Sequence, residues 1–144
     1  MKIFALSRVA FANLLDELTD QQKEQSSFIS INEVDPLFVE FQPDSPNYLN
    51  LRFDDVEEDL PLLNGMKCVL FDENMANEIY DFVQRNLDKK AFFVHCTMGK
   101  CRSGAVAETL SDYFGERYEE FKRNNPQVQP NTLVKRILRK RFDI

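Results

Sequence analysis

The feature of this sequence that most constrains its fold is an apolar run leading directly into a short loop. Ala91–Val94 reads AFFV, which is typical of a strand buried on both faces. The segment HCTMGKCRSG (95–104) follows at once, and 105–114 is predicted to be a helix. A strand, a tight loop and a helix in succession direct several backbone N–H groups into one concavity at the positive end of the helix dipole. The segment therefore predicts an anion-binding loop.

Segments with strand and helix patterns alternate along the rest of the chain. The predicted strands are 2–6, 27–31, 48–53 and 91–94, and the predicted helices are 10–18, 73–87, 105–114, 118–123 and 132–141. Segments 42–47 and 61–65 are predicted to be a turn and an irregular connection. This alternation predicts one α/β domain over 1–144, with a central, mainly parallel sheet flanked by helices. In such sheets, sites form at the carboxyl ends of central strands, which is where 95–104 falls.

Composition and charge narrow the function classes. The net charge of −6 argues against nucleic acid or an anionic membrane as the main partner. No apolar run approaches the roughly 18 residues that span a bilayer, so we expect no membrane insertion. Three cysteines without the spacing of a disulfide framework fit a reducing compartment, which predicts a cytoplasmic protein. The single histidine offers no second imidazole for a metal, so we expect neither metal nor cofactor.

Cys96 and Arg102 bracket the loop and carry its predicted chemistry. Cys96 lies within the positive field of the following helix, which favours a thiolate. Arg102 offers a planar fork to two phosphate oxygens. Gly99 lets the backbone adopt conformations that a side chain forbids and leaves room for an oxyanion. A thiolate facing a phosphate cradle meets the requirements for nucleophilic attack on phosphorus.

The segment HCTMGKCRSG resembles the signature loop of the cysteine-dependent protein-tyrosine-phosphatase superfamily: His-Cys, five residues with Gly third, Arg, then Ser or Thr. The resemblance covers residues 45–115. The absence of a Trp-Pro-Asp sequence indicates the small dual-specificity or atypical branch, and the compact chain resembles its small single-domain members of bacterial or phage type. It implies a hydrolase that removes phosphate from phosphotyrosine, and also from phosphoserine or phosphothreonine, through a phosphocysteine intermediate. The implied partner is a phosphorylated protein or another phosphomonoester.

The resemblance also assigns roles to single residues. Cys96 would be the nucleophile, and Arg102 would bind the phosphate and stabilise the transition state. Ser103 would hydrogen-bond the Cys96 sulfur and make it a better leaving group, and His95 would orient the loop and favour the thiolate. The implied substrate-binding residues are Thr97, Met98, Gly99, Lys100, Cys101 and Arg102.

The leaving group also needs a general acid, because an alkoxide or phenoxide leaves poorly unless it is protonated. In the family this acid is an Asp on a separate upstream loop. The segment YLNLRFDD (48–55) resembles the strand that ends in it, which makes Asp55 the predicted acid. Asp54 is the adjacent alternative, and Glu57, Glu58 and Asp59 lie further along.

Four alternatives stay open at this point. A phosphatase-like module that binds phosphorylated partners without turnover would use the same loop. Cys101 is either a spacer or a resolving thiol for Cys96, as in arsenate reduction or sulfur transfer. Lys100 is either solvated or selects highly charged substrates such as phosphoinositides and nucleotides. The basic stretch 135–141 is either a solvated helix face or a docking surface.

Overall fold

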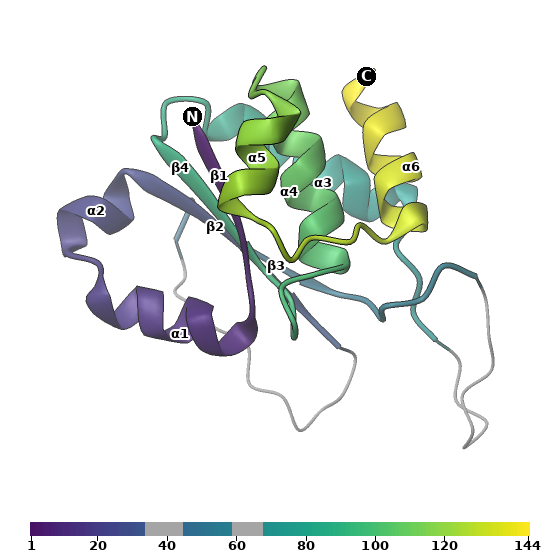
Figure 1. Ribbon diagram of the computed structural model, residues 1–144, viewed down its shortest axis with the longest axis horizontal. Helices are drawn as coiled ribbons and strands as arrows, with labels where there is room; N and C mark the ends of the chain where they lie inside the picture. Colours follow the sequence, from purple (N-terminus) through teal and green to yellow (C-terminus); the bar gives the residue numbers. More distant parts are fainter. Residues whose placement is uncertain (34–44, 59–67) are drawn as a thin grey trace.

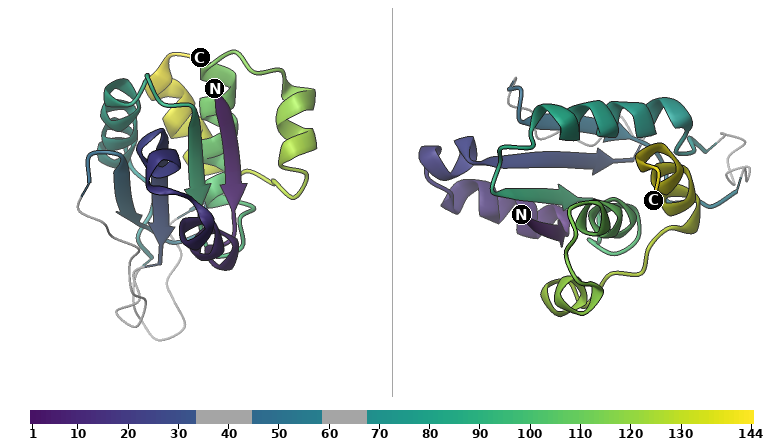
Figure 2. Two further views of the ribbon diagram at one scale, coloured as in Figure 1. Left: turned by 90° about the vertical axis from the view of Figure 1, so that its left-hand side faces the viewer. Right: turned by 90° about the horizontal axis from the view of Figure 1, so that it is seen from above.

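The structure is a computed structural model, and it describes residues 1–33, 45–58 and 68–144. These residues form a four-stranded sheet with helices on both faces (Figures 1 and 2). The strands are β1 (Lys2–Leu6), β2 (Ser26–Asn32), β3 (Tyr48–Arg52) and β4 (Ala91–His95). The helices are α1 (Arg8–Glu17), α2 (Asp20–Glu24), α3 (Glu73–Arg85), α4 (Arg102–Tyr113), α5 (Tyr118–Asn124) and α6 (Thr132–Phe142). No helix in these ranges is both long and apolar enough to cross a membrane.

All four strands run parallel, in the order β1-β4-β2-β3. Leu6 of β1 and Ser30 of β2 both align with His95, the last residue of β4. Asn32 of β2 aligns with Arg52, the last residue of β3. The chain therefore leaves all four strands at the same end of the sheet, and the segments that follow them gather there.

The two faces of the sheet are covered unequally. Helices α3 and α4 cover the main core, which includes Ile29, Phe92 and Val94, all fully buried. Helix α1 covers the opposite face through Phe11, whose ring centroid lies 5.9 Å from that of Phe28. On this face Phe93 is only half-buried, because Phe11 is the one residue of α1 that is itself buried. The side chains of β4 that face α3 and α4 are therefore buried as predicted, whereas Phe93, which faces α1, is less buried than predicted.

The element boundaries differ from the sequence prediction where side chains cap helices. Helix α1 begins at Arg8 rather than Ala10, because Ser7 Oγ accepts a hydrogen bond from the Ala10 amide at 3.1 Å. Helix α2 was not predicted; Thr19 and Gln22 form its reciprocal capping box. Helix α4 begins three residues before the predicted start. The segment 61–65 and residues 42–44 lie outside the described residues.

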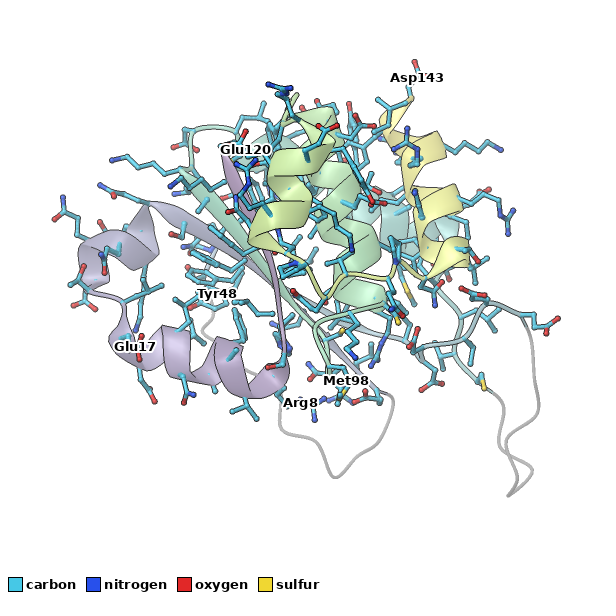
Figure 3. All side chains as sticks on the ribbon, in the orientation of Figure 1. Arg8, Glu17, Tyr48, Met98, Glu120 and Asp143 are labelled. Atoms are coloured by element: carbon cyan, nitrogen blue, oxygen red, sulfur yellow. The ribbon has the colours of Figure 1, made fainter. Side chains whose placement is uncertain are left out.

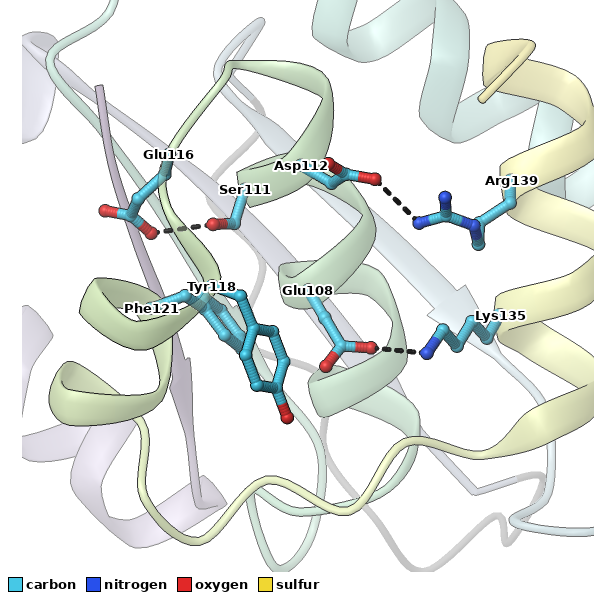
Figure 4. A pocket seen from close by; sticks show the side chains of 8 residues that line it. All are labelled: Glu108, Ser111, Asp112, Glu116, Tyr118, Phe121, Lys135 and Arg139. Carbon is cyan, nitrogen blue, oxygen red and sulfur yellow. Dashed lines mark hydrogen bonds and ion pairs between the residues drawn. The ribbon is translucent and has the colours of Figure 1, made fainter.

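The basic side chains of α6 largely find partners within the fold. Lys135 pairs with Glu108 at 2.9 Å and Arg139 pairs with Asp112 at 2.8 Å, both on α4 (Figure 4). The guanidinium of Arg141 lies 3.6 Å from the centroid of the Tyr80 ring on α3. These three basic residues therefore help to fix α6 against its neighbours.

Candidate active site

The loop from Cys96 to Cys101 joins β4, a central strand, to the N-terminus of α4. Cys96 is 2% exposed, and its Sγ lies 3.1 Å from the hydroxyl oxygen of Ser103, in the first turn of α4. The sulfur is thus held at the floor of the loop beside a group that can donate a hydrogen bond to a thiolate.

Four carbonyl groups of the loop accept hydrogen bonds from residues outside it. Thr97 O accepts from the Arg8 amide at 3.2 Å, and Gly99 O accepts from the Gln127 side chain at 3.1 Å. The two further pairs are Lys100 O with the Gln129 amide at 3.1 Å and Cys101 O with the Asn131 amide at 2.9 Å. The backbone N–H groups of 97–102 donate to no acceptor among the described residues. The loop therefore keeps a set of unused amide donors, while these four carbonyls are occupied.

Gly99 has a φ of 73°, in the left-handed region that favours glycine, as the sequence predicted. A Cβ at this position would lie 2.5 Å from Ser7 N and 2.6 Å from Leu6 C. The space that glycine leaves is therefore taken by the backbone between β1 and α1. This corrects the expectation that the space serves an oxyanion, and it explains how the loop packs so closely on the neighbouring strand end.

Arg102 is 4% exposed and held by three groups. Its NH1 donates to Phe53 O at 3.0 Å, and its NH2 donates to Glu33 Oε1 at 2.6 Å and to Thr97 Oγ1 at 3.3 Å. Its buried Nε has no acceptor among the described residues. The guanidinium is therefore fixed in orientation with one buried N–H donor unused.

Glu33, just beyond β2, is a site residue that the sequence did not reveal. Its carboxylate bridges two arginines, with Oε2 at 2.8 Å from Arg8 NH2 and Oε1 against Arg102, and it also accepts from the Thr97 hydroxyl. Burial opposes its charged form, but the hydrogen bonds from Thr97, Arg102 and Arg8 outweigh burial and lower the pKa of Glu33 to about 2. It is therefore a carboxylate at neutral pH. No local motif marks it, since only the alignment of parallel strand ends brings it to the loop.

His95 is fully buried beneath the loop, with its ring stacked on Phe11 at 4.3 Å. Burial lowers its pKa to about 4, so the imidazole is neutral at neutral pH. Nδ1 lies 3.3 Å from Cys96 O, which can only accept, so Nδ1 carries the proton. Nε2 then accepts from the Ser30 hydroxyl at 2.6 Å. His95 thus acts on the loop through hydrogen bonds and not through a positive charge.

The two candidate acids lie in different surroundings. Asp54 Oδ2 accepts from the Val69 amide at 2.8 Å, and the Asp54 amide donates to Val69 O at 2.8 Å. Asp55 is exposed, and its Oδ1 accepts from Asn131 Nδ2 at 2.9 Å. Burial, followed by the charge of Asp55, raises the pKa of the Cys101 thiol, which places Asp55 beside the end of the loop. The Asp54 carboxylate is thus hydrogen-bonded to a backbone amide, whereas the Asp55 carboxylate lies beside Cys101 at the end of the loop.

The remaining predicted contacts lie around the mouth of the loop. Lys100 and Met98 are exposed, and Met98 points outward at the same end of the molecule as Arg8 (Figure 3). A cleft of about 500 Å³ opens beside Cys101 and is lined by Asp55 and Asn131 among other residues. In the described ranges, no three His, Cys, Asp or Glu side chains converge to hold a metal ion.

Comparisons with known proteins show the fold. No protein-family model and no curated protein matches the chain. The PTP-2 phosphatase of Cydia pomonella matches with a TM-score of 0.59 over 97% of this chain and 85% of that one, at 15% identity. Human DUSP28 matches with a TM-score of 0.50 over 98% and 91% of the two chains, at 21% identity. The human tyrosine phosphatase-like serine/threonine/tyrosine-interacting protein matches with a TM-score of 0.50 over 87% and 82%, at 20% identity.

These structural neighbours are tyrosine and dual-specificity phosphatases or a phosphatase-like protein. The predicted α/β fold, with a parallel sheet flanked by helices, is therefore confirmed as the fold of that group. At identities of 15–21%, these matches show a shared fold only. The chemistry of this chain has to follow from the residues of its own site.

Proposed function

We propose that this protein is a cysteine-dependent phosphomonoester hydrolase of the small dual-specificity or atypical branch, of bacterial or phage type. Its substrates are phosphotyrosine proteins and also phosphoserine or phosphothreonine proteins. The observation that carries the proposal is the loop from 97 to 102, where four carbonyls accept hydrogen bonds from residues outside the loop while the amides have no acceptor among the described residues. Such an array, together with the unused Nε of Arg102, suits a tetrahedral oxyanion above the Cys96 sulfur.

The first chemical step transfers the phosphoryl group to the enzyme. The Cys96 thiolate attacks phosphorus, the bond from phosphorus to the leaving oxygen breaks, and Asp55 gives its proton to that oxygen. Arg102 and the loop amides stabilise the charge on the equatorial oxygens. The products of this step are phosphocysteine and the free alcohol or phenol.

The second step regenerates the enzyme. The Asp55 carboxylate takes a proton from water, the water oxygen attacks phosphorus, and the phosphorus–sulfur bond breaks. The Ser103 hydroxyl, 3.1 Å from Sγ, donates a hydrogen bond to the departing thiolate. Inorganic phosphate leaves, and no metal or cofactor takes part in either step.

A cytoplasmic location remains a prediction from cysteine content.

The test is hydrolysis of a small aryl phosphate and of phosphopeptides in the presence of a metal chelator. Wild type should turn over both, and Cys96→Ser and Arg102→Ala should abolish turnover. Cys68→Ser, which removes a buried thiol elsewhere in the fold, is the matched control and should stay active. Full activity of Cys96→Ser would sink the mechanism.

A second candidate function is capture of phosphorylated partners without turnover. It is favoured by one observation, the likeness of fold to a phosphatase-like interacting protein. Tight phosphopeptide binding by wild type with no release of phosphate would decide for this function. The presence of Cys96, Arg102 and a loop-facing Asp55 favours hydrolysis.

A further inference from the structure

Asn131 lies where three parts of the candidate active site meet. Its amide donates to Cys101 O at 2.9 Å, at the end of the loop. Its Nδ2 donates to Asp55 Oδ1 at 2.9 Å and to Val56 O at 3.2 Å. Its Oδ1 accepts from the Val134 amide at 3.1 Å and so caps α6. The residue is 2% exposed, and each of its side-chain polar atoms is used.

The orientation of the Asn131 amide follows from its partners. The Val134 amide can only donate, so the atom facing it must be Oδ1. The other atom is therefore the NH₂ group, which faces the Asp55 carboxylate and the Val56 carbonyl, both acceptors. The helix cap thus fixes which group is presented to the acid.

We propose that Asn131 is a positioning residue for the general acid of the proposed hydrolase, on which this role rests. Asn131 Nδ2 donates a hydrogen bond to Asp55 Oδ1, so the proton for the leaving group is carried by the other carboxyl oxygen, Oδ2. Its backbone N–H donates a hydrogen bond to Cys101 O, so Asn131 also ties the segment that carries the acid (54–58) to the residue before Arg102. One buried residue therefore links the proton donor, through its side chain, to the phosphate cradle, through its backbone.

Independent observations agree with this role. Asp55 is exposed, and in the described part of the chain only Asn131 and the Cys101 thiol hydrogen-bond its carboxylate. The cleft of about 500 Å³ beside them leaves space for a leaving group next to Asp55. Loss of Asn131 Nδ2 would therefore leave the acid on a loop with little to orient it.

Two substitutions separate the positioning role from the helix cap. Asn131→Asp keeps an oxygen for the Val134 amide but turns a charged oxygen toward Asp55. Asn131→Ser keeps a good capping residue that is too short to reach Asp55. Asp72→Ala is the matched control, because Asp72 caps α3 through the Met75 amide at 2.9 Å and, among the described residues, its side chain forms no hydrogen bond or ion pair with residues 54–58.

The measurement is kcat and KM for a series of aryl phosphates that differ in leaving-group basicity, with the pH profile of kcat. Both Asn131 variants should lower kcat for poor leaving groups roughly tenfold or more, since general acids contribute about 10²–10⁴-fold, and should spare good leaving groups. Asn131→Asp should also move the basic limb of the profile to higher pH, because a second carboxylate disfavours ionised Asp55. Asp72→Ala should lower only the unfolding midpoint.

Two outcomes would overturn the role, and they differ from failure of the proposed function. If both Asn131 variants keep the wild-type dependence on leaving group and pH, or lose activity equally for all leaving groups, Asn131 is only a cap. If wild type shows no Cys96-dependent turnover at all, the proposed function fails and the role fails with it.

Discussion

The Glu33 carboxylate and the Arg102 guanidinium form an ion pair of 2.6 Å at the rim of the loop 96–101. The other carboxylate oxygen of Glu33 holds Arg8 at 2.8 Å, so one acid fixes two cations that arrive from different strand ends. Since Arg102 is 4% exposed, this pairing restricts the direction in which its unused Nε points. The orientation of the Arg102 guanidinium thus depends on a residue 69 positions away along the chain.

Removal of Glu33 should therefore weaken phosphate binding. We expect Glu33→Ala to lower kcat/KM roughly tenfold, a loss of about 1.4 kcal/mol of transition-state stabilisation. The kcat/KM of Glu33→Gln should lie between those of wild type and Glu33→Ala, because Gln keeps a hydrogen-bond acceptor. Steady-state kinetics with an aryl phosphate measures the change. Glu116→Gln, which alters a carboxylate bonded to Ser111 away from the loop, is the control. An unchanged kcat/KM in Glu33→Ala would show that Arg102 is oriented without it.

Asp55 and Asp54 should respond in opposite ways. Asp55→Asn should lower kcat about 10²-fold or more for poor leaving groups and little for good ones. Asp54→Asn should cost about 1 kcal/mol of stability through its bond to the Val69 amide and keep the dependence on leaving group. Kinetics and urea unfolding of both variants make the comparison. The reverse pattern would assign the acid to Asp54.

Ser103→Ala should slow the second step more than the first. A hydrogen bond to a charged group contributes about 1.5–3 kcal/mol, so hydrolysis of phosphocysteine should slow roughly tenfold to a hundredfold. Pre-steady-state kinetics should then show a burst of phenol followed by slow turnover. Absence of a burst, together with a slower first turnover, would place Ser103 in the first step instead.

His95 should make the fold sensitive to mild acid. Burial holds its pKa at about 4, below the ordinary 6.5, so the unfolded chain binds more protons between these values. Stability is then complete above about pH 6.5 and falls by roughly 3 kcal/mol as the pH approaches 4. The lowered pKa of Glu33, about 2, adds a second loss only below its ordinary 4.5.

Urea unfolding at about pH 7.5 and about pH 5 measures this loss. His95→Gln, which has no group that titrates in this range, should show a nearly flat stability between the two conditions. A wild-type stability that does not change between them would contradict a neutral, buried His95.

Much of the fold and part of the site could be predicted because the signals are local. Strands β2 and β3 follow alternating apolar residues, β4 follows a continuous apolar run, and Cys96, Gly99, Arg102 and Ser103 lie in one contiguous segment. Helix α2 could have been found from Thr19 and Gln22, whose spacing is that of a capping box.

The remaining site residues could not be predicted, because their contacts are long-range. Glu33 and Arg8 reach the loop only through the strand order β1-β4-β2-β3. Asn131 reaches Asp55 from 76 positions away along the chain. Adjacent aspartates carry the same local pattern, so the difference between Asp54 and Asp55 appears only when Val69 and Asn131 are in place.

The central claim is that Cys96 becomes phosphorylated during turnover. Rapid acid quench of wild type and Ser103→Ala with an aryl phosphate, followed by peptide mass spectrometry, tests it directly. We expect one added phosphoryl group on the peptide that contains Cys96, more abundant in Ser103→Ala and absent from Cys96→Ser. Turnover with no phosphoryl group on that peptide, or with one on a different residue, would contradict a phosphocysteine intermediate at Cys96.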